Sequence, residues 1–104
     1  MDPSSHRHFV LRDGYVEPGG ARHREGTLRP ATAKEEIRAL LDFRVHLRAE
    51  SFLPILLAQV TVRLGELPRL DPGILERLSS DDLQLLEGLY REMNGYPALH
   101  ERRP

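Results

Sequence analysis

The sequence has no cysteine and no tryptophan, and only 6% of its 104 residues are aromatic. Without cysteine the chain can form neither disulfides nor cysteine–zinc sites, which agrees with a reducing compartment. An excess of charge of one sign is also missing, because the formal net charge is −1 although 30% of the residues are charged. This balance gives no broad field to steer the protein onto nucleic acid or an acidic membrane surface.

Long hydrophobic runs are missing as well. The longest apolar segment covers residues 52–67 and is too short and too polar for a membrane span, which needs about 20 mostly apolar residues. No positively charged start followed by an apolar run is seen, so we expect a cytoplasmic protein without a secretory signal or a membrane partner. The length predicts one domain at 9–96, between flexible tails at 1–8 and 97–104.

Residues 9–30 are expected to form a small antiparallel β-hairpin. Short β-prone runs surround Asp13-Gly14, and Pro18-Gly19-Gly20 gives a strong turn signal because glycine takes positive φ without steric cost. The hairpin has few large apolar side chains, and a lone hairpin is marginally stable in water. We therefore expect it to be the least stable part of the domain.

About four helices are expected within residues 32–94. Thr32 and Glu35 have the spacing of a capping box at the start of the first helix, and Ile37, Leu40 and Leu41 give this helix one apolar face. Residues 43–51 fit either a loop or a broken helical turn. Asp71 and Pro72 have the pattern of an N-cap and a first helical residue, which predicts another short helix.

The last helix is expected to begin at Ser80 and to end at Asn94-Gly95. Asp81 and Asp82 would then lie favourably at its positive N-terminal end. They could instead mimic a catalytic carboxylate pair, but adjacent helical residues point about 100° apart. A helix-turn-helix is a further interpretation of this region, yet the acidic residues of the second helix would repel DNA, so no nucleic-acid partner is expected.

Residues 52–67 are predicted to be a central core helix that ends at Gly65. Its strongest apolar stripe recurs with helical spacing and is expected to pack against the last helix. The residues of this core are Leu53, Leu57, Val60 and Leu64, with Leu83, Leu86 and Leu89. The expected fold is mainly α, with a small hairpin followed by about four helices packed round the central one (α+β by strict count).

Three apolar residues of the central helix, Phe52, Ile55 and Val62, lie away from its main stripe. Either the hairpin or the first helix covers them, or they bind a protein partner or a second copy of the chain. We predict the second outcome, because the hairpin offers few apolar side chains to cover them.

No catalytic, cofactor-binding or metal-binding residue is expected. His6, His8 and His23 could in principle gather round a metal, but no cysteine or well-spaced carboxylate accompanies them. Ser79-Ser80 lacks a base and an orienting partner, and nucleophilic catalysis needs all three roles. The sequence therefore predicts a protein that is not an enzyme.

Short motifs follow one another in a characteristic order from about Gly14 to Asn94. They are Gly14-Tyr15-Val16, His23-Arg24-Glu25-Gly26, Ala31-Thr32-Ala33 with Glu36-Ile37, Arg44-Val45, Leu56-Leu57, Leu64-Gly65 with Leu67-Pro68, Asp82-Leu83, and Leu89-Tyr90-Arg91. This order resembles the phage tail assembly proteins of contractile tails, including those encoded beside extracellular contractile injection systems, and the related tail assembly chaperones. Such proteins often carry Asn-Pro before the long helix, where this chain has Arg48-Ala49 and a later Pro54.

The resemblance implies a non-enzymatic cytoplasmic assembly factor. Tail chaperones are thought to hold the apolar tape-measure protein while tube subunits polymerise round it, so the implied partners are tape-measure or tail tube and baseplate proteins. The family has no agreed catalytic residues. An alternative is a permanent structural adaptor subunit of the particle, and a small helix-turn-helix regulator is a third reading.

Overall fold

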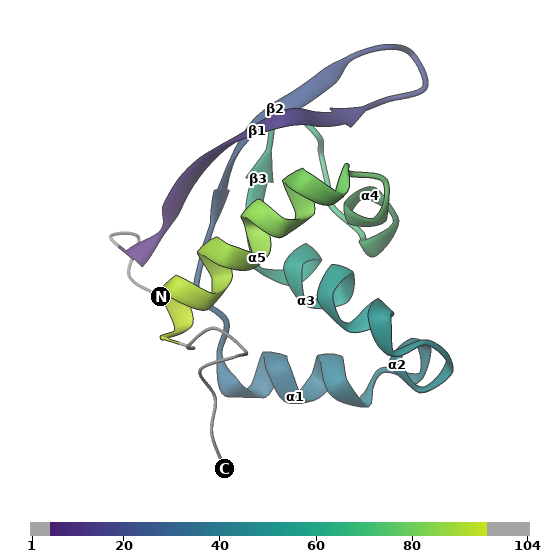
Figure 1. The fold of residues 1–104 in the computed structure, drawn as a ribbon, viewed down its shortest axis with the longest axis vertical. Coiled ribbons are helices and arrows are strands. Elements are labelled where there is room, and N and C mark those ends of the chain that lie inside the picture. Colours follow the sequence, from purple (N-terminus) through teal and green to yellow (C-terminus); the bar gives the residue numbers. More distant parts are fainter. Residues whose placement is uncertain (1–4, 96–104) are drawn as a thin grey trace.

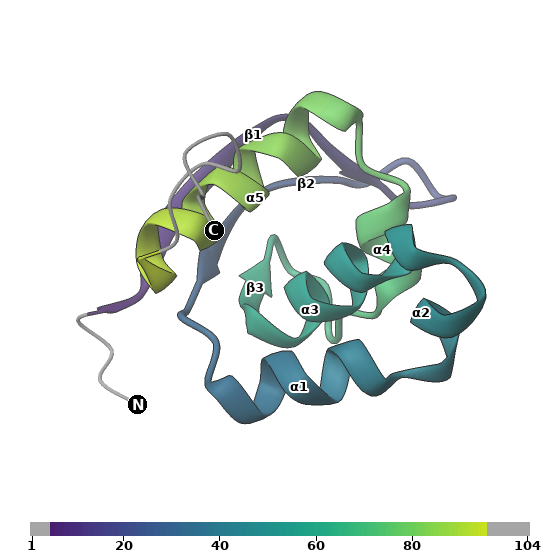
Figure 2. The same cartoon turned by 60° about the horizontal axis from the view of Figure 1, so that its bottom comes forward.

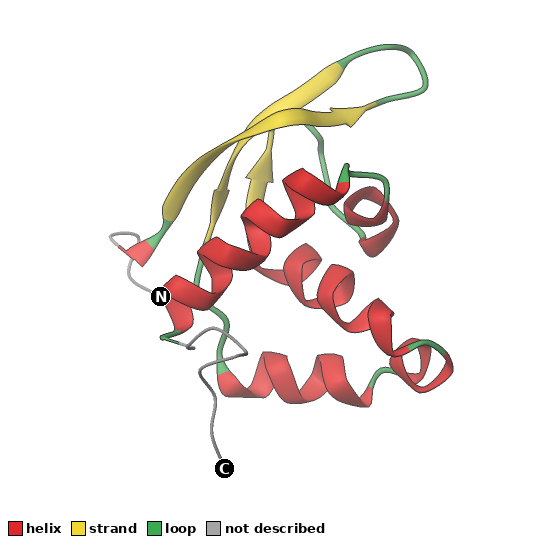
Figure 3. Ribbon diagram, in the orientation of Figure 1, coloured by secondary structure: helices red, strands yellow, loops and turns green. Residues whose placement is uncertain are grey.

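A three-stranded antiparallel sheet with helices packed against one of its faces makes up the protein (Figure 1). The computed structural model describes residues 5–95. In chain order the elements are β1 (Arg7–Val16), β2 (Arg22–Leu28), α1 (Ala33–Leu41), α2 (Phe43–Leu47), the 3-10 helix η2 (Ala49–Ser51), α3 (Phe52–Val60), β3 (Thr61–Leu64), α4 (Pro72–Glu76) and α5 (Ser80–Asn94). Of the described residues 52% are helical and 23% lie in strands, so the domain is α+β and the expected mainly α fold is wrong (Figure 3).

The sheet has the order β1-β2-β3, with β2 in the centre. β1 and β2 pair as the hairpin predicted for residues 9–30, although β1 already begins at Arg7, inside the expected N-terminal tail. β3 pairs with β2 through Leu64 opposite Gly26. The expected C-terminal tail at 97–104 lies outside the described residues.

The predicted central helix is the main source of the wrong fold class. It ends at Val60, and Thr61–Leu64 turns back as the third strand. The helix can stop there because its last carbonyl groups are bonded: the Thr61 hydroxyl donates to Leu57 O at 2.6 Å and the Arg29 amide donates to Val60 O at 2.9 Å. Gly65 takes the predicted positive φ, 56°, but follows a strand and does not cap a helix.

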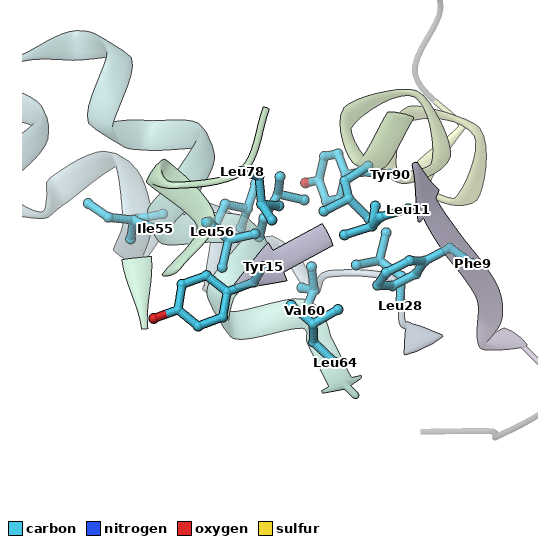
Figure 4. Packing of buried hydrophobic residues seen from close by; sticks show 14 residues of the cluster. Phe9, Leu11, Tyr15, Leu28, Ile55, Leu56, Val60, Leu64, Leu78 and Tyr90 are labelled. Atoms are coloured by element: carbon cyan, nitrogen blue, oxygen red, sulfur yellow. The ribbon is translucent and has the colours of Figure 1, made fainter. Parts of the chain in front are cut away.

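One hydrophobic core lies between the sheet and the helices (Figure 4). The hairpin contributes four of its buried residues, namely Phe9, Leu11, Tyr15 and Leu28. Of the core predicted from sequence, Leu57, Val60, Leu64 and Leu86 are buried, while Leu53, Leu83 and Leu89 are partly buried against it. The hairpin is thus part of the core itself, and its low stability stays a prediction.

A large bulge in β1 joins the hairpin to α5. Val10 pairs with Glu25 and Tyr15 with His23, so residues 11–14 of β1 face only Arg24. Asp82 Oδ1 accepts a hydrogen bond from the backbone amide of residue 12 at 2.8 Å, and Oδ2 accepts from the amides of residues 13 and 14 at 3.0 and 2.8 Å. One carboxylate therefore binds three amides that the bulge has turned away from the ladder.

Asp82 lies in the first turn of α5, as predicted, but is only 1% exposed. Burial alone would raise the pKa of its carboxyl group, but hydrogen bonds from the bulge amides and from Ser79 outweigh burial and lower the pKa. α5 begins at Ser80 as predicted, and Ser79 is its N-cap. The capping box of Thr32 and Glu35 is present as predicted.

Residues 43–51 form α2 and η2, which resolves the choice between a loop and a broken helix. Asp71 caps α4 with Pro72 in its first turn, and Gly95 ends α5 with φ 73°. Among residues 5–95, no helix has both the length and the apolar character that a membrane crossing requires.

Candidate protein-binding surface

Helix α1 is amphipathic, yet its apolar face points to solvent. Only Ala39 of this helix is buried. Five large apolar side chains of α1 and α2 are each between 56% and 78% exposed, namely Ile37, Leu40, Leu41, Phe43 and Leu47. We call these five residues the α1–α2 apolar surface. Figures 1 and 2 both show α1 at the outside of the molecule, with α3 next to it on the inner side.

Strong local interactions hold α1 in place without burying this face. Arg29 NH1 and NH2 donate to the two carboxylate oxygens of Glu35 at 2.9 and 2.5 Å. Arg29 lowers the pKa of Glu35 to about 2, and Glu35 also accepts from the Thr32 amide in the capping box. Arg29 NH2 further donates to Gln59 O at 3.0 Å. One arginine thus connects the end of β2, the start of α1 and the end of α3.

The short helix α2 is held by a similar local pair. Asp42 Oδ1 accepts from the Arg44 amide at 2.9 Å and caps the helix. The Arg44 guanidinium bonds both Asp42 oxygens, and the pKa of Asp42 is lowered to about 2 by these hydrogen bonds. Two caps at residues 32 and 42 therefore define α1 and α2 independently of a partner.

A groove of about 340 Å³ adjoins the apolar surface and shares Leu40 with it. The lining residues are Glu36, Leu40, Phe52, Leu53, Leu56, Glu87, Tyr90 and Arg91. Its charged groups are engaged: the Tyr90 hydroxyl donates to Glu36, and Arg91 NH2 bonds Glu87 at 2.9 Å. What the groove offers to a ligand is therefore mainly its apolar side chains, those of α1 and α3.

The three residues predicted to bind a partner are not brought together. Phe52 is half-buried and lines the groove. Ile55 is 3% exposed and belongs to the core. It is therefore covered by the rest of the domain, which was the alternative to partner binding. Val62 is 50% exposed on the edge strand β3. Only Phe52 lies beside the apolar surface of α1.

The α1–α2 apolar surface is the feature that sequence reasoning missed. The sequence predicted one apolar face for the first helix but not that this face would be exposed, and amphipathic helices usually bury their apolar side. A signal was present in the next residues: Phe43 and Leu47 continue an i, i+4 apolar pattern directly after Asp42. In the structure both helices, α1 and α2, leave their large apolar side chains exposed.

The three histidines considered as metal ligands have different surroundings. His8 is exposed, whereas His23 is 8% exposed and stacks on Tyr15 with ring centroids 6.5 Å apart. His23 Nε2 lies 2.5 Å from Glu17 Oε2, and Nδ1 accepts from the Glu66 amide at 3.2 Å. Both ring nitrogens of His23 thus have protein partners. Across residues 5–95 no group of three or more His, Cys, Asp or Glu side chains could hold a metal ion.

Comparison with protein-family models, with curated proteins and with solved structures gave no match to this chain. Three glycines of the short motifs, Gly14, Gly26 and Gly65, lie where a Cβ atom would clash. At Gly14 it would lie 2.2 Å from His23 O, at Gly26 2.2 Å from Arg63 O, and at Gly65 2.2 Å from the His23 ring. These motif positions therefore serve the hairpin and sheet geometry.

Proposed function

We propose that this protein is a non-enzymatic assembly factor, which binds a protein partner through the α1–α2 apolar surface and the groove beside it. The observation that carries the proposal is the exposure of five large apolar side chains within residues 37–47. Single exposed apolar residues are ordinary on a protein surface, whereas a group of them marks an association site. The resemblance to tail assembly chaperones supports the same kind of function.

The partner that fits this surface is an amphipathic helical segment. Such a helix binds in a groove through apolar anchors at positions i, i+3, i+4 and i+7. Leu40 and Phe52 supply apolar contacts at the groove, Ile37 lies one turn before Leu40 on α1, and Leu41 directly follows Leu40 at the end of the helix. In a contractile tail or injection system, the candidates are the tape-measure protein and the tube or baseplate proteins.

A second candidate function uses the same surface permanently. A structural adaptor subunit of the particle would bury these side chains in a lasting interface, and obligate interfaces are more apolar than transient ones. A chaperone is absent from finished particles, whereas an adaptor is present at fixed stoichiometry. Mass spectrometry of purified particles and of cell lysate separates these two functions.

The binding test compares two double variants. Leu41→Ser with Leu47→Ser removes two of the most exposed side chains of the surface, while the control Val16→Ser with Leu85→Ser changes exposed residues of β1 and α5. Each protein is co-expressed with the tape-measure, tube and baseplate proteins of a contractile tail, and retention is measured by pull-down. Circular dichroism and sedimentation report folding and self-association.

We expect the Leu41/Leu47 variant to fold. The amount of partner that it retains should fall about tenfold or more, since a few central apolar residues carry most association energy. The control should retain the partner. Equal retention by both variants overturns the proposed surface. Loss of self-association alone would show that the surface joins two copies of this chain.

A further inference from the structure

Three arginines lie round a second hollow, on the sheet. This hollow measures about 520 Å³ and is lined by Arg22, Arg24 and Arg63, together with Val10, Glu25 and Glu66 among others. Its lining residues belong to the β1–β2 hairpin, to β3 and to the turn after β3. Figure 1 shows the β1–β2 hairpin at the end of the molecule opposite α1. The hollow is therefore separate from the α1–α2 apolar surface.

Backbone carbonyl groups hold all three guanidinium groups. Arg22 NH1 donates to Asp13 O at 2.6 Å and Arg24 Nε donates to Leu11 O at 2.9 Å, both within the β1 bulge. Arg63 NH1 donates to Gly65 O at 3.3 Å. A carbonyl oxygen orients a guanidinium group without forming an ion pair with it, and each group has five N–H donors.

Several other arginines of the chain are paired with carboxylates. They are Arg12, Arg29, Arg44 and Arg91. Within the part of the chain that the structure describes, the three arginines of the hollow form none. They are thus oriented, positively charged and available to a carboxylate in the fork geometry that arginine prefers.

We propose that this hollow binds an acidic segment of a protein partner. Two of its features favour a peptide over a nucleic acid. Glu25 and Glu66 line the same hollow, and they would repel a continuous row of phosphates but not carboxylates spaced along a peptide. Val10 adds an exposed apolar side chain, which suits a peptide with apolar residues between its acidic ones.

The test uses a fluorescein-labelled peptide of alternating glutamate and leucine, and a labelled single-stranded oligonucleotide of similar length. Fluorescence anisotropy measures the Kd of each for the full chain at low and at moderate salt. The variants are Arg63→Gln, Arg22→Gln and Glu25→Gln. The matched control is Arg38→Gln, an exposed arginine of α1 outside the hollow.

We expect Arg63→Gln to weaken peptide binding about tenfold, since one charge-assisted bidentate contact is lost. Glu25→Gln should tighten it several-fold by removing repulsion, and Arg38→Gln should leave it unchanged. The Arg63 guanidinium group is exposed and donates to the turn backbone at Gly65 O, so thermal melting of this variant should match that of the wild-type chain even if Arg22→Gln loosens the bulge. An equal loss in Arg38→Gln, tighter binding of the oligonucleotide, or no peptide binding at low salt would each overturn the proposal.

Discussion

The guanidinium group of Arg29 and the carboxylate of Glu35 form two hydrogen bonds, at 2.9 and 2.5 Å, at the point where the sheet passes into the first helix. The two side chains are partly buried, and Arg29 also bonds Gln59 O at the end of α3. The pair therefore fixes the direction in which α1 leaves β2. Because α1 buries only Ala39, this polar connection replaces part of the packing that usually places a helix.

Replacing Glu35 by Gln should lower the free energy of unfolding by about 1–2 kcal/mol at pH 7, as expected for hydrogen bonds to charged groups. The pKa of Glu35 is lowered from 4.5 to about 2 in the folded protein, so its contribution is present above pH 4.5 and is lost as pH falls towards 2. Urea denaturation between pH 7 and pH 3 measures the free energy of unfolding of both proteins and its pH dependence. The exposed Glu50→Gln serves as control, and a parallel pH dependence of Glu35→Gln and wild type would contradict the assignment.

Replacing Asp82 by Asn should destabilise the protein by about 2–4 kcal/mol, because the bulge amides lose a charged acceptor and one of them faces an NH₂ group. The lowered pKa of Asp82 means that its contribution is present above the ordinary carboxyl pKa and disappears in acid. Chemical denaturation at pH 7 is the measurement. Asp81→Asn changes an exposed neighbour and should cost less than about 0.5 kcal/mol.

Two glycine-to-alanine changes should have opposite signs. Gly65 has φ 56° and a Cβ there would lie 2.2 Å from His23 Nδ1, so Gly65→Ala should cost more than about 1 kcal/mol. Gly88 lies inside α5 with nothing within 4 Å of its Cβ position, so Gly88→Ala should stabilise by about 0.5–1 kcal/mol. Thermal melting compares them, and the same sign for both would show that the turn after β3 is not constrained by His23.

Replacing Ile55 by serine should destabilise the protein much more than replacing Val62 by serine, because Ile55 is in the core and Val62 is on the surface. Ile55 is 3% exposed, so Ile55→Ser should cost about 3 kcal/mol or more through lost burial and a cavity. Val62 is 50% exposed on an edge strand, so Val62→Ser should cost less than about 1 kcal/mol. Urea denaturation measures the free energy of unfolding of the two single variants. A folded, fully stable Ile55→Ser protein would show that this residue does not belong to the core.

Local signals in the sequence predicted local structure well. The capping box at Thr32 and Glu35, the Asp71 cap and the turn at Gly95 depend on hydrogen bonds within a few residues. The third strand could not be predicted in this way. Thr61–Leu64 continues a helical apolar pattern, and it becomes a strand because a distant strand, β2, offers its free edge.

The candidate site was predicted only in part for a related reason. Phe52 lies at the groove, but a helical wheel could not show that Ile55 is buried in the core or that α1 would leave Leu40 and Leu41 exposed. Which side of an amphipathic helix meets the core depends on how much apolar area the other elements already cover. The buried role of Asp82 also had no local signal, because its partners lie in β1.

The bulge and its carboxylate have a consequence for the order in which the protein can mature. Asp82 follows the amides that it binds by 68 to 70 positions. A ribosome that adds about 5–20 residues per second needs roughly 3–14 s to pass from Gly14 to Asp82. Throughout that interval the first strand has been made but cannot adopt its final shape, so the nascent domain stays open until its last helix emerges.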